Sequence, residues 1–543
     1  MDDADIAELT RAFLDRHFAE SPELATMNGL DGLDDRLPAL GADDIVRRAR
    51  EDDEWDERFA AIADDALSAE ERVDRDLVRS LLRGRQILHE WQDWRRLPDT
   101  YAQPGLTGLF ALFLRRLHPE PELVRSARAR LDAIPALLDA GRANLDPELV
   151  RAPIAGRGVN LCRAAAGYVR ELVPAEVADD AGRAELAEAG ARAAEAYGAF
   201  GAHLTDLQER ATGTWEVDER RYTALLRDKE LLDFDAAALR ERGAAAYDEL
   251  ATEMRELARR HWATDDSRSV LRELADHRPQ TPEEMRLGYE QATERAHQFL
   301  IQNGLVTLPD GEHCDVVPSP PFLRPVLAVA SYQRPPVFRS SCTGRFNVPF
   351  PPDGTPPDEV AQRLATNCYA EMPTVSVHEA YPGHHWHFVR LRAIHAEDRP
   401  LRCILTTPYL SEGWALYAEL MMREQGFFTD PAHELAHLDA RLFRAARIVV
   451  DTSLHCGDMG FDEAVTFMRD RAGLTEPVAR AEVTRYCAWP TQASAYLTGS
   501  FEIERLRQRW FDEQAGDLLT FHDTLCGSAA LPIALAERTL FPA

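Results

Sequence analysis

The sequence predicts a mainly α-helical protein with one small β-sheet. Helical periodicity dominates residues 1–305, short apolar runs separated by prolines fill residues 312–352, and helical periodicity resumes at Asp358 and continues to the C-terminus. A chain of 543 residues is long enough for two lobes, because single hydrophobic cores stop growing well below that length. We therefore expect a helical lobe over residues 1–305 and a second lobe over residues 306–543 that contains the sheet.

The N-terminal half shows two kinds of helix signal. Leu77, Leu81, Leu88 and Trp91 lie at offsets of 4, 11 and 14 residues, which places them on one apolar helix face. Residues 183–210 consist largely of Ala, Glu, Arg and Leu, which favour helix, and they lack the alternation typical of a strand. Both segments are predicted to be helices.

The middle of the chain changes character. Residues 281–284, Thr-Pro-Glu-Glu, supply an N-cap, a first-turn proline and a capping-box carboxylate, and Asn303-Gly304 ends the helix that they begin. The apolar runs that follow, CDVV (314–317), VLAVASY (326–332) and FNVPF (346–350), have the length of strands. They predict the one small sheet, set just before the most distinctive motif of the chain.

Composition limits the class of protein. Hydrophobic residues make up 45% of the chain and charged residues 28%, as in ordinary globular proteins. The formal net charge of −30 would repel nucleic acid and anionic lipid, so we expect neither nucleic acid nor a membrane as a partner. Eight cysteines without a CxxC pair, an acidic N-terminus and the lack of a run of about 18 apolar residues favour a cytoplasmic protein with reduced thiols.

The most informative segment is HEAYPGHHWH, residues 378–387. It nearly matches HExxH, in which two histidines one helical turn apart bind zinc and the Glu polarises water. Here Pro382 takes the place of the second histidine. At about 100° per residue, His384 would lie about 240° around a straight helix from His378, whereas His385 would be nearly in line but about 10 Å further along the axis.

A straight helix therefore cannot bring either later histidine to the same zinc ion. Pro382 has no backbone N–H to donate, and Gly383 tolerates unusual dihedral angles. This pair is expected to break the helix and to return His384 or His385 to the metal.

A zinc site that also admits water needs a third protein ligand, often a Glu on a following helix. The segment SEGWALYAE, residues 411–419, offers two such carboxylates. Glu412 opens the predicted helix and Glu419 lies two turns later on the same face, so one can bind the metal while the other hydrogen-bonds a ligand histidine. We predict one Zn²⁺ ion bound by His378, by Glu412 and by a histidine of the PGHH segment.

Four motifs within residues 375–500 resemble those of the bacterial family catalogued as domain of unknown function 885: HEAYPGHH, EGWALYAE, DTSLH and RYCAWPTQASAYLTG. The resemblance implies a zinc metallopeptidase of the HExxH type, with a mostly helical, bilobed body similar to carboxypeptidase Taq and oligopeptidases. The family pattern has His after Pro-Gly and allows His, Tyr or Phe next, which implies His384 rather than His385 as the second ligand. It implies zinc-dependent hydrolysis more firmly than any substrate.

Several side chains are candidates for the chemistry. Glu379 is predicted to take a proton from the attacking water and to pass it to the leaving amine. Tyr496 is the first candidate to donate a hydrogen bond to the oxyanion of an amide carbonyl, followed by His455 and Tyr486. Arg485 can hold a substrate carboxylate or carbonyl group.

Two further residues are predicted to contact the substrate. Gln492 lies in the same motif as Tyr496. Asn347 lies in the segment RFNVP, residues 345–349, which we interpret as an edge strand along which a peptide adds by main-chain pairing.

Arg447, Asp451 and His455 recur every four residues and form a polar stripe on a predicted helix. The stripe is either an exposed, salt-bridged face or, because residues 448–450 are apolar, the lining of a buried site.

Three functions fit these patterns. The first is a peptidase that cleaves short peptides, and the second is a zinc hydrolase of a nonpeptide amide or ester. The third is a noncatalytic binding protein on the same fold. Glu379 favours the two enzymes, because a binding protein needs no general base.

Overall fold

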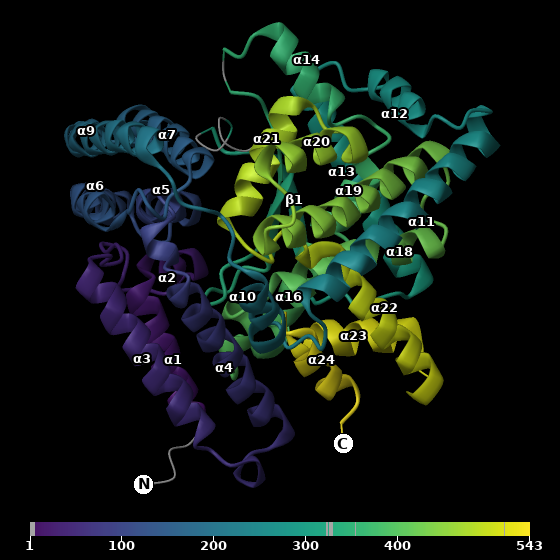
Figure 1. Ribbon diagram of the computed structural model, residues 1–543, viewed down its shortest axis with the longest axis horizontal. Coiled ribbons are helices and arrows are strands. Elements are labelled where there is room, and N and C mark those ends of the chain that lie inside the picture. The colour runs from purple at the N-terminus through teal and green to yellow at the C-terminus, as the bar shows by residue number, and fades with distance from the viewer. Residues whose placement is uncertain (1–5, 322–323, 325–328, 353, 515, 543) are drawn as a thin grey trace. The chain divides into compact units, whose positions relative to one another are not determined.

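The computed structural model describes residues 6–321, 324, 329–352, 354–514 and 516–542, and in them the protein is mainly α-helical with one small sheet (Figure 1). The chain divides into two compact units, Met1–Trp215 with Pro336–Ser340 and Glu216–Pro335 with Ser341–Ala543. The predicted boundary at residue 305 does not coincide with this division, because the helices between residues 216 and 305 pack with the second unit.

The first unit is built from helices that pack on their sequence neighbours and on one long helix, α9. This helix, Asp180–Arg210, covers the predicted segment 183–210 and begins where the Asp179 carboxylate accepts a hydrogen bond from the Gly182 N–H. The remaining α-helices of the unit are α1 (Ile6–Glu20), α2 (Pro22–Asn28), α3 (Ala42–Ala60), α4 (Ala69–Glu90), α5 (Asp99–Arg115), α6 (Glu120–Asn144), α7 (Ala152–Gly167) and α8 (Val173–Ala175).

The second unit contains the sheet and every residue that the sequence marks as a candidate for the chemistry. No described helix is long and apolar enough to cross a membrane. The helices of this unit are α10 (Glu219–Ala224), α11 (Ala236–Trp262), α12 (Ser267–Asp276), α13 (Pro282–Asn303), α14 (Pro357–Ala365), α15 (Met372–Glu379), α16 (His384–His395), α17 (Leu401–Ile404), α18 (Pro408–Glu424), α19 (Pro431–Cys456), α20 (Phe461–Ala472), α21 (Glu476–Ala488), α22 (Ala495–Gln514), α23 (Leu518–Ser528) and α24 (Ile533–Leu540).

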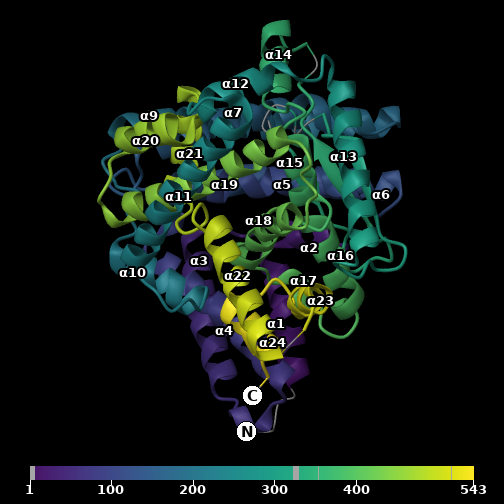
Figure 2. The same cartoon turned by 90° about the vertical axis from the view of Figure 1, so that its right-hand side faces the viewer.

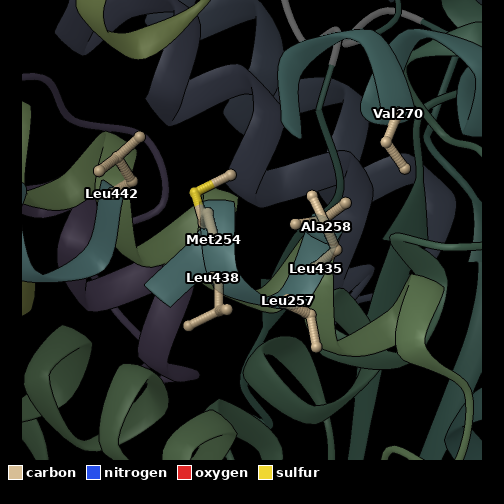
Figure 3. Close-up of a cluster of buried hydrophobic side chains, with 7 residues drawn as sticks. All are labelled: Met254, Leu257, Ala258, Val270, Leu435, Leu438 and Leu442. Atoms are coloured by element: carbon tan, nitrogen blue, oxygen red, sulfur yellow. The ribbon is translucent and has the colours of Figure 1, made fainter. Parts of the chain in front are cut away.

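Helix α19 is anchored along α11, and the two lie side by side in both views (Figures 1 and 2). Apolar side chains spaced three or four residues apart fill the seam between them and α12, so each helix buries its apolar face (Figure 3). The seam consists of Met254, Leu257, Ala258, Val270, Leu435, Leu438 and Leu442. This packing fixes α19, which also contacts α15 and α18.

The predicted start and end of α13 are confirmed. Thr281 caps the helix by accepting a hydrogen bond from the Glu284 N–H at 3.1 Å, and Gly304 ends it in the left-handed conformation. The Glu284 carboxylate accepts a hydrogen bond from the Gln280 N–H at 2.7 Å, one residue before the N-cap.

The small sheet has the strand order β1-β3-β2, with β1 (His313–Pro318), β2 (Ser331–Gln333) and β3 (Thr343–Val348). β1 runs parallel to β3 and β2 antiparallel to it. Of the predicted run 326–332, residues 326–328 lie outside the described residues, and the end of the run forms β2. Helix α16 contacts β2 and β3, which confirms a sheet beside the helix that follows the HEAYPG segment.

The prediction of an edge strand at 345–349 is wrong. β3 is the central strand, and Asn347 pairs with Val317 of β1 on one side and with Ser331 of β2 on the other. Its main-chain groups are therefore used within the sheet, and a peptide cannot add along β3.

Helices α18 and α22 cross where two glycines meet. A Cβ atom on Gly499 would lie 1.8 Å from the Tyr409 carbonyl oxygen and 2.8 Å from Gly413 Cα. Only glycine permits this approach, which brings the start of α18, with Glu412, next to the first turns of α22, with Tyr496.

We expect Gly499→Ala to destabilise the protein by about 2 kcal/mol or more, because the added methyl group would overlap backbone that cannot move independently. Gly198→Ala in α9 is the control, because a Cβ atom there meets nothing within 4 Å. It should be neutral or stabilising by up to about 1 kcal/mol. Thermal denaturation of both variants measures the difference, and equal midpoints would contradict the close crossing.

Candidate metal centre

The predicted break in the HEAYPGHH helix is present. Helix α15 ends at Glu379 and α16 begins at His384, with Ala380 at φ −116°, ψ −85° and Gly383 at φ −67°, ψ −131° between them. The Tyr381–Pro382 peptide bond is cis. A Cβ atom on Gly383 would lie 1.9 Å from the His378 carbonyl oxygen, so glycine is required for the chain to return this closely.

Three hydrogen bonds hold the break in place. The indole N–H of Trp414 on α18 donates to the Pro382 carbonyl oxygen at 2.8 Å. The Tyr381 hydroxyl donates to Glu312 Oε2 at 2.6 Å, and His385 Nε2 lies 2.6 Å from the same oxygen. Glu312 therefore ties the break and the first turn of α16 to the loop before β1.

The break brings three ligand-type side chains together. His378 from α15, His384 from α16 and Glu412 from α18 each offer one atom within 4.8 Å of the others. The Nε2 atoms of His378 and His384 lie 3.4 and 3.3 Å from Glu412 Oε2. Both histidines are buried, at 7% and 9% exposed.

These distances suit a shared zinc ion better than direct hydrogen bonds. Zinc bonds of about 2.0–2.2 Å at tetrahedral angles separate neighbouring ligand atoms by about 3.4 Å. An N–H···O hydrogen bond is normally shorter, at about 2.7–3.2 Å. Two imidazole nitrogens and one carboxylate are also the ligand set of many catalytic zinc sites, so the residues fit the predicted ion.

His385 is committed to other partners. Its Nδ1 lies 3.0 Å from the Tyr332 hydroxyl, and its Nε2 is bonded to Glu312. Both ring nitrogens are thus occupied, whereas His384 directs Nε2 to Glu412. The geometry selects His384 from the two histidines as the candidate ligand.

Glu419 orients His378. Its Oε1 lies 2.8 Å from His378 Nδ1, while its Oε2 accepts a hydrogen bond from the Thr374 hydroxyl at 2.6 Å and lies 3.3 Å from His437 Nδ1. A carboxylate on Nδ1 fixes the ring tautomer and leaves Nε2 available as a metal ligand. Glu419 is thus the carboxylate that hydrogen-bonds a ligand histidine, one of the two roles that the spacing of the EGWALYAE motif allows.

The two carboxylates at the centre differ in their acidity. Burial raises the pKa of Glu412, but His384 and His378 outweigh it and hold this pKa well below its usual range. Burial lowers the pKa of His378, but Glu412 and Glu419 raise it to about 10. Burial raises the pKa of Glu379, and the two histidines oppose this effect only in part. Glu412 is therefore set to stay ionised, whereas Glu379 accepts a proton more readily.

Glu379 ends α15, next to the first ligand histidine, and is partly exposed. Within the described part of the chain, its carboxylate forms no hydrogen bond or ion pair. It is free to bond to a small molecule at the centre.

Tyr496 borders the same centre. The Glu412 carboxylate contributes, after burial, to a raised pKa of its phenol. Gln492 Nε2 donates to the Tyr496 hydroxyl at 3.2 Å, and Gln492 Oε1 accepts from Arg485. The guanidinium carbon of Arg447 lies 5.0 Å from the Tyr496 ring centre. Three residues predicted separately, Arg485, Gln492 and Tyr496, thus form one hydrogen-bonded row.

The other predicted residues lie apart from the three ligand-type side chains. His455 is fully buried, with Nε2 2.9 Å from the Tyr486 carbonyl oxygen. The Tyr486 hydroxyl is bonded to Glu482 at 2.7 Å and to Arg447 at 3.1 Å. Asn347 is buried in the central strand. The structure thus gives His455 and Tyr486 hydrogen-bond partners within the protein.

The polar stripe on α19 is buried, so its interpretation as an exposed face is wrong. Asp451 Oδ2 accepts hydrogen bonds from Tyr222 at 2.6 Å and from Ser494 at 3.0 Å. Arg447 bonds to residues of α21, so the stripe joins α19 to its neighbours.

Sequence reasoning missed two carboxylates and one indole. The Glu312 carboxylate is hydrogen-bonded to His385 beside the helix break, and the Glu482 carboxylate accepts hydrogen bonds from Arg447 and Arg485. The Trp414 indole donates a hydrogen bond to the Pro382 carbonyl oxygen. Glu312 and Glu482 lie outside the motifs, and no local pattern marks them. Trp414 directly follows Glu412-Gly413 in the EGWA motif, and that position was the available signal.

The first unit holds another group of ligand-type residues, Asp31, Asp34 and His118. Asp31 pairs with Arg339, and Asp34 accepts a hydrogen bond from the Thr26 hydroxyl and lies 3.0 Å from His118 Nε2. These contacts account for the group without an ion.

Fold and centre together define a mainly α-helical protein with a His-His-Glu cluster, in which the two buried histidines lie on either side of a helix break. The chain matches the family described as bacterial protein of unknown function (DUF885) over residues 22–540, and it belongs to that family. None of the curated proteins compared with it matches.

Two solved structures share the fold. A candidate lipoprotein of unknown function from Shewanella oneidensis has a TM-score of 0.80 and 20% identity, covering 98% of this chain and 99% of its own. A candidate lipoprotein from Colwellia psychrerythraea has a TM-score of 0.83 and 19% identity, covering 98% of each chain. At this identity the likeness establishes the fold alone.

Replacing the carboxylate behind His378 should weaken metal binding without removing a ligand. We expect Glu419→Gln to bind zinc about 10–100-fold more weakly than the wild type, because the His378 ring loses its charged partner. Glu424→Gln, on the same helix but paired with Arg507 at the surface, is the matched control. Competition with a fluorescent zinc chelator measures both, and equal affinities would contradict the supporting role.

Proposed function

We propose that this protein is a zinc-dependent hydrolase, most simply a peptidase that cleaves amide bonds of short peptides. One observation carries the proposal. Two buried histidine nitrogens stand at tetrahedral ligand spacing from one carboxylate oxygen, and the unbonded carboxylate of Glu379 lies next to them. A site built only to hold a metal has no use for that additional carboxylate.

His378, His384 and Glu412 would hold the ion. A bound zinc ion would supply Lewis acidity, polarising a carbonyl group and making water more acidic. Glu379 would take the proton of the attacking water at its carboxylate and deliver it to the leaving nitrogen, a role that its raised pKa supports. Tyr496 would donate its hydroxyl hydrogen to the oxygen on which negative charge develops.

The burial of the two histidine ligands favours a small substrate, because a folded protein cannot present an amide bond to residues that are only 7% and 9% exposed. A nonpeptide amide or ester meets the same requirement and is the alternative substrate class. A noncatalytic binding protein remains the third possibility, and the position of Glu379 speaks against it. The net charge of −30 gives no support to nucleic acid or an anionic membrane as partner.

The location of the protein stays a prediction. The composition favours the cytoplasm, whereas the two proteins with the same fold are candidate lipoproteins. Fractionation of the native host would separate the two.

We expect the purified protein to carry about one zinc ion per chain, and His378→Ala and His384→Ala to lose it on dialysis, since each removes one of three protein ligands. His313→Ala is the control, because that side chain is 70% exposed on β1. His385→Gln should keep zinc if His384 is the second ligand. Elemental analysis measures all five proteins, and a wild type without stoichiometric zinc would rule out the metal centre.

Glu379→Gln should retain zinc and lose at least about 100-fold in kcat on a pool of short peptides, because the amide cannot accept the proton of water. Glu397→Gln, on the exposed surface after α16, is the matched control and should keep full activity. Mass spectrometry of the digested pool gives the rates. Undiminished turnover by Glu379→Gln would remove this residue from the mechanism.

A further inference from the structure

Two arginines meet beside Tyr496, and they share one carboxylate. Arg447 Nη2 on α19 donates to Glu482 Oε2 at 2.9 Å, and Arg485 Nη2 on α21 donates to the same oxygen at 3.0 Å. The Tyr486 hydroxyl donates to it as well, at 2.7 Å. We call Arg447, Arg485 and Glu482 the arginine cluster.

The arginine cluster has an unbalanced positive charge. Burial opposes ionisation of Glu482, but Arg447 and Arg485 lower its pKa to about 2, so it carries one negative charge against two positive ones. The side chains of Arg447, Arg485 and Glu482 are only 10%, 17% and 22% exposed. Charges withdrawn from water are costly unless they are paired. One more negative group would complete the cluster.

Among the described residues, Glu482 is the one carboxylate that bonds to Arg447 or Arg485. Asp451, one turn beyond Arg447 on α19, directs Oδ2 to Tyr222 and Ser494 instead. Within the described chain, neither Arg447 Nη1 nor Arg485 Nε has a hydrogen-bond partner, so each arginine keeps donor capacity. The free donors and the unpaired charge belong to the same two side chains.

The arginine cluster is joined to the metal centre through Tyr496. Arg485 donates to Gln492, and Gln492 donates to the Tyr496 hydroxyl. Arg447 lies against the Tyr496 ring. Tyr496 in turn stands beside Glu412, across the close crossing of α18 and α22. Tyr496 therefore contacts the arginine cluster and also feels the charge of Glu412.

We infer that the arginine cluster binds a free carboxylate of the substrate, so that the amide cleaved at the metal centre lies close to a carboxyl group. This inference rests on the proposed hydrolase. The reaction adds the OH of water to the carbonyl carbon, breaks the C–N bond and gives the remaining proton to the nitrogen, so the products are a carboxylic acid and an amino acid or short peptide with its own carboxylate. The C-terminus of a peptide and the carboxylate of an N-acyl amino acid share this chemistry.

The charge and shape of the arginine cluster favour a carboxylate. An excess of one positive charge is neutralised by one carboxylate, whereas a phosphate dianion would leave an unpaired negative charge. Planar guanidinium groups also match the two oxygens of a carboxylate.

The test compares matched substrates on the full-length, zinc-loaded protein. One pool contains N-acetylated tripeptides with a free C-terminal carboxylate, and the other contains the same tripeptides as C-terminal carboxamides. N-acetyl amino acids and their amides form a second pair. Comparing the two pairs shows whether the bound carboxylate is that of a peptide C-terminus or that of an N-acyl amino acid. We expect kcat/KM to be at least about 100-fold higher for the acids of one pair, because charge-assisted hydrogen bonds to the arginines are lost with the amides.

Arg485→Gln should lower kcat/KM for the acids much more than for the amides, so that the preference for the acids falls below about tenfold. Arg485→Lys keeps the charge but loses the planar group, and should recover part of the preference. Arg480→Gln is the matched control on the same helix, because Arg480 is exposed and pairs with Asp462 and Glu476. Thermal denaturation checks that each variant is folded.

A separate readout keeps this inference distinct from the proposed function. Calorimetry on Glu379→Gln measures binding of the acids and amides without turnover, and the acids should bind more tightly. Hydrolysis of amides and acids at equal rates would overturn the carboxylate site and leave the hydrolase standing. Tight, Arg485-dependent binding of the acids without any zinc or hydrolysis would overturn the hydrolase and leave the carboxylate site standing.

Discussion

The chain must leave the α-helix between Glu379 and His384, and the metal centre depends on that departure. His384 lies six positions after His378, and no regular helix lets residues at that spacing share a ligand. Instead, the chain folds back so that Gly383 lies against the His378 carbonyl group, which brings His384 towards His378. Because the Trp414 indole holds the Pro382 carbonyl, the helix that supplies Glu412 also fixes the position of His384. Two ligands are thus set by one short segment of α18.

The carboxylates of the centre differ in role because they differ in partners. Glu412 faces two histidines and stays ionised, Glu419 stands behind one of them, and Glu379 has no partner. Burying carboxylates without partners would cost several kcal/mol each, so three of them are tolerated here only because cations or hydrogen-bond donors surround most of them. The one left without a partner is the one whose proton affinity is raised, as a general base requires.

The features that the sequence predicts well are those with local causes. Proline and glycine act on their own backbone, so the break at Pro382-Gly383 and the ends of α13 could be read from the chain. Helical spacing predicted that one of Glu412 and Glu419 would support a ligand histidine, and the structure gives that position to Glu419. Glu312, in contrast, meets His385 across 73 residues, and Glu482 meets Arg447 across 35, and no local pattern carries such pairings. The edge-strand prediction failed for the same reason, because β2 covers β3 through a connection that the sequence does not specify.

Tyr496 has groups of opposite charge on its two sides, the metal centre and the arginine cluster. With a bound Zn²⁺, the carboxylates of Glu379, Glu412 and Glu419 would leave the metal end with one negative charge, while the arginine cluster carries one positive charge. A whole chain with a net charge of −30 does not attract an anion from a distance. Any preference for a carboxylate must therefore arise at contact, from arginines that are nearly buried and only weakly screened by salt. Burial makes an arginine without a charged partner costly. The site therefore selects a substrate with a carboxylate, because an uncharged analogue leaves the arginine cluster unpaired.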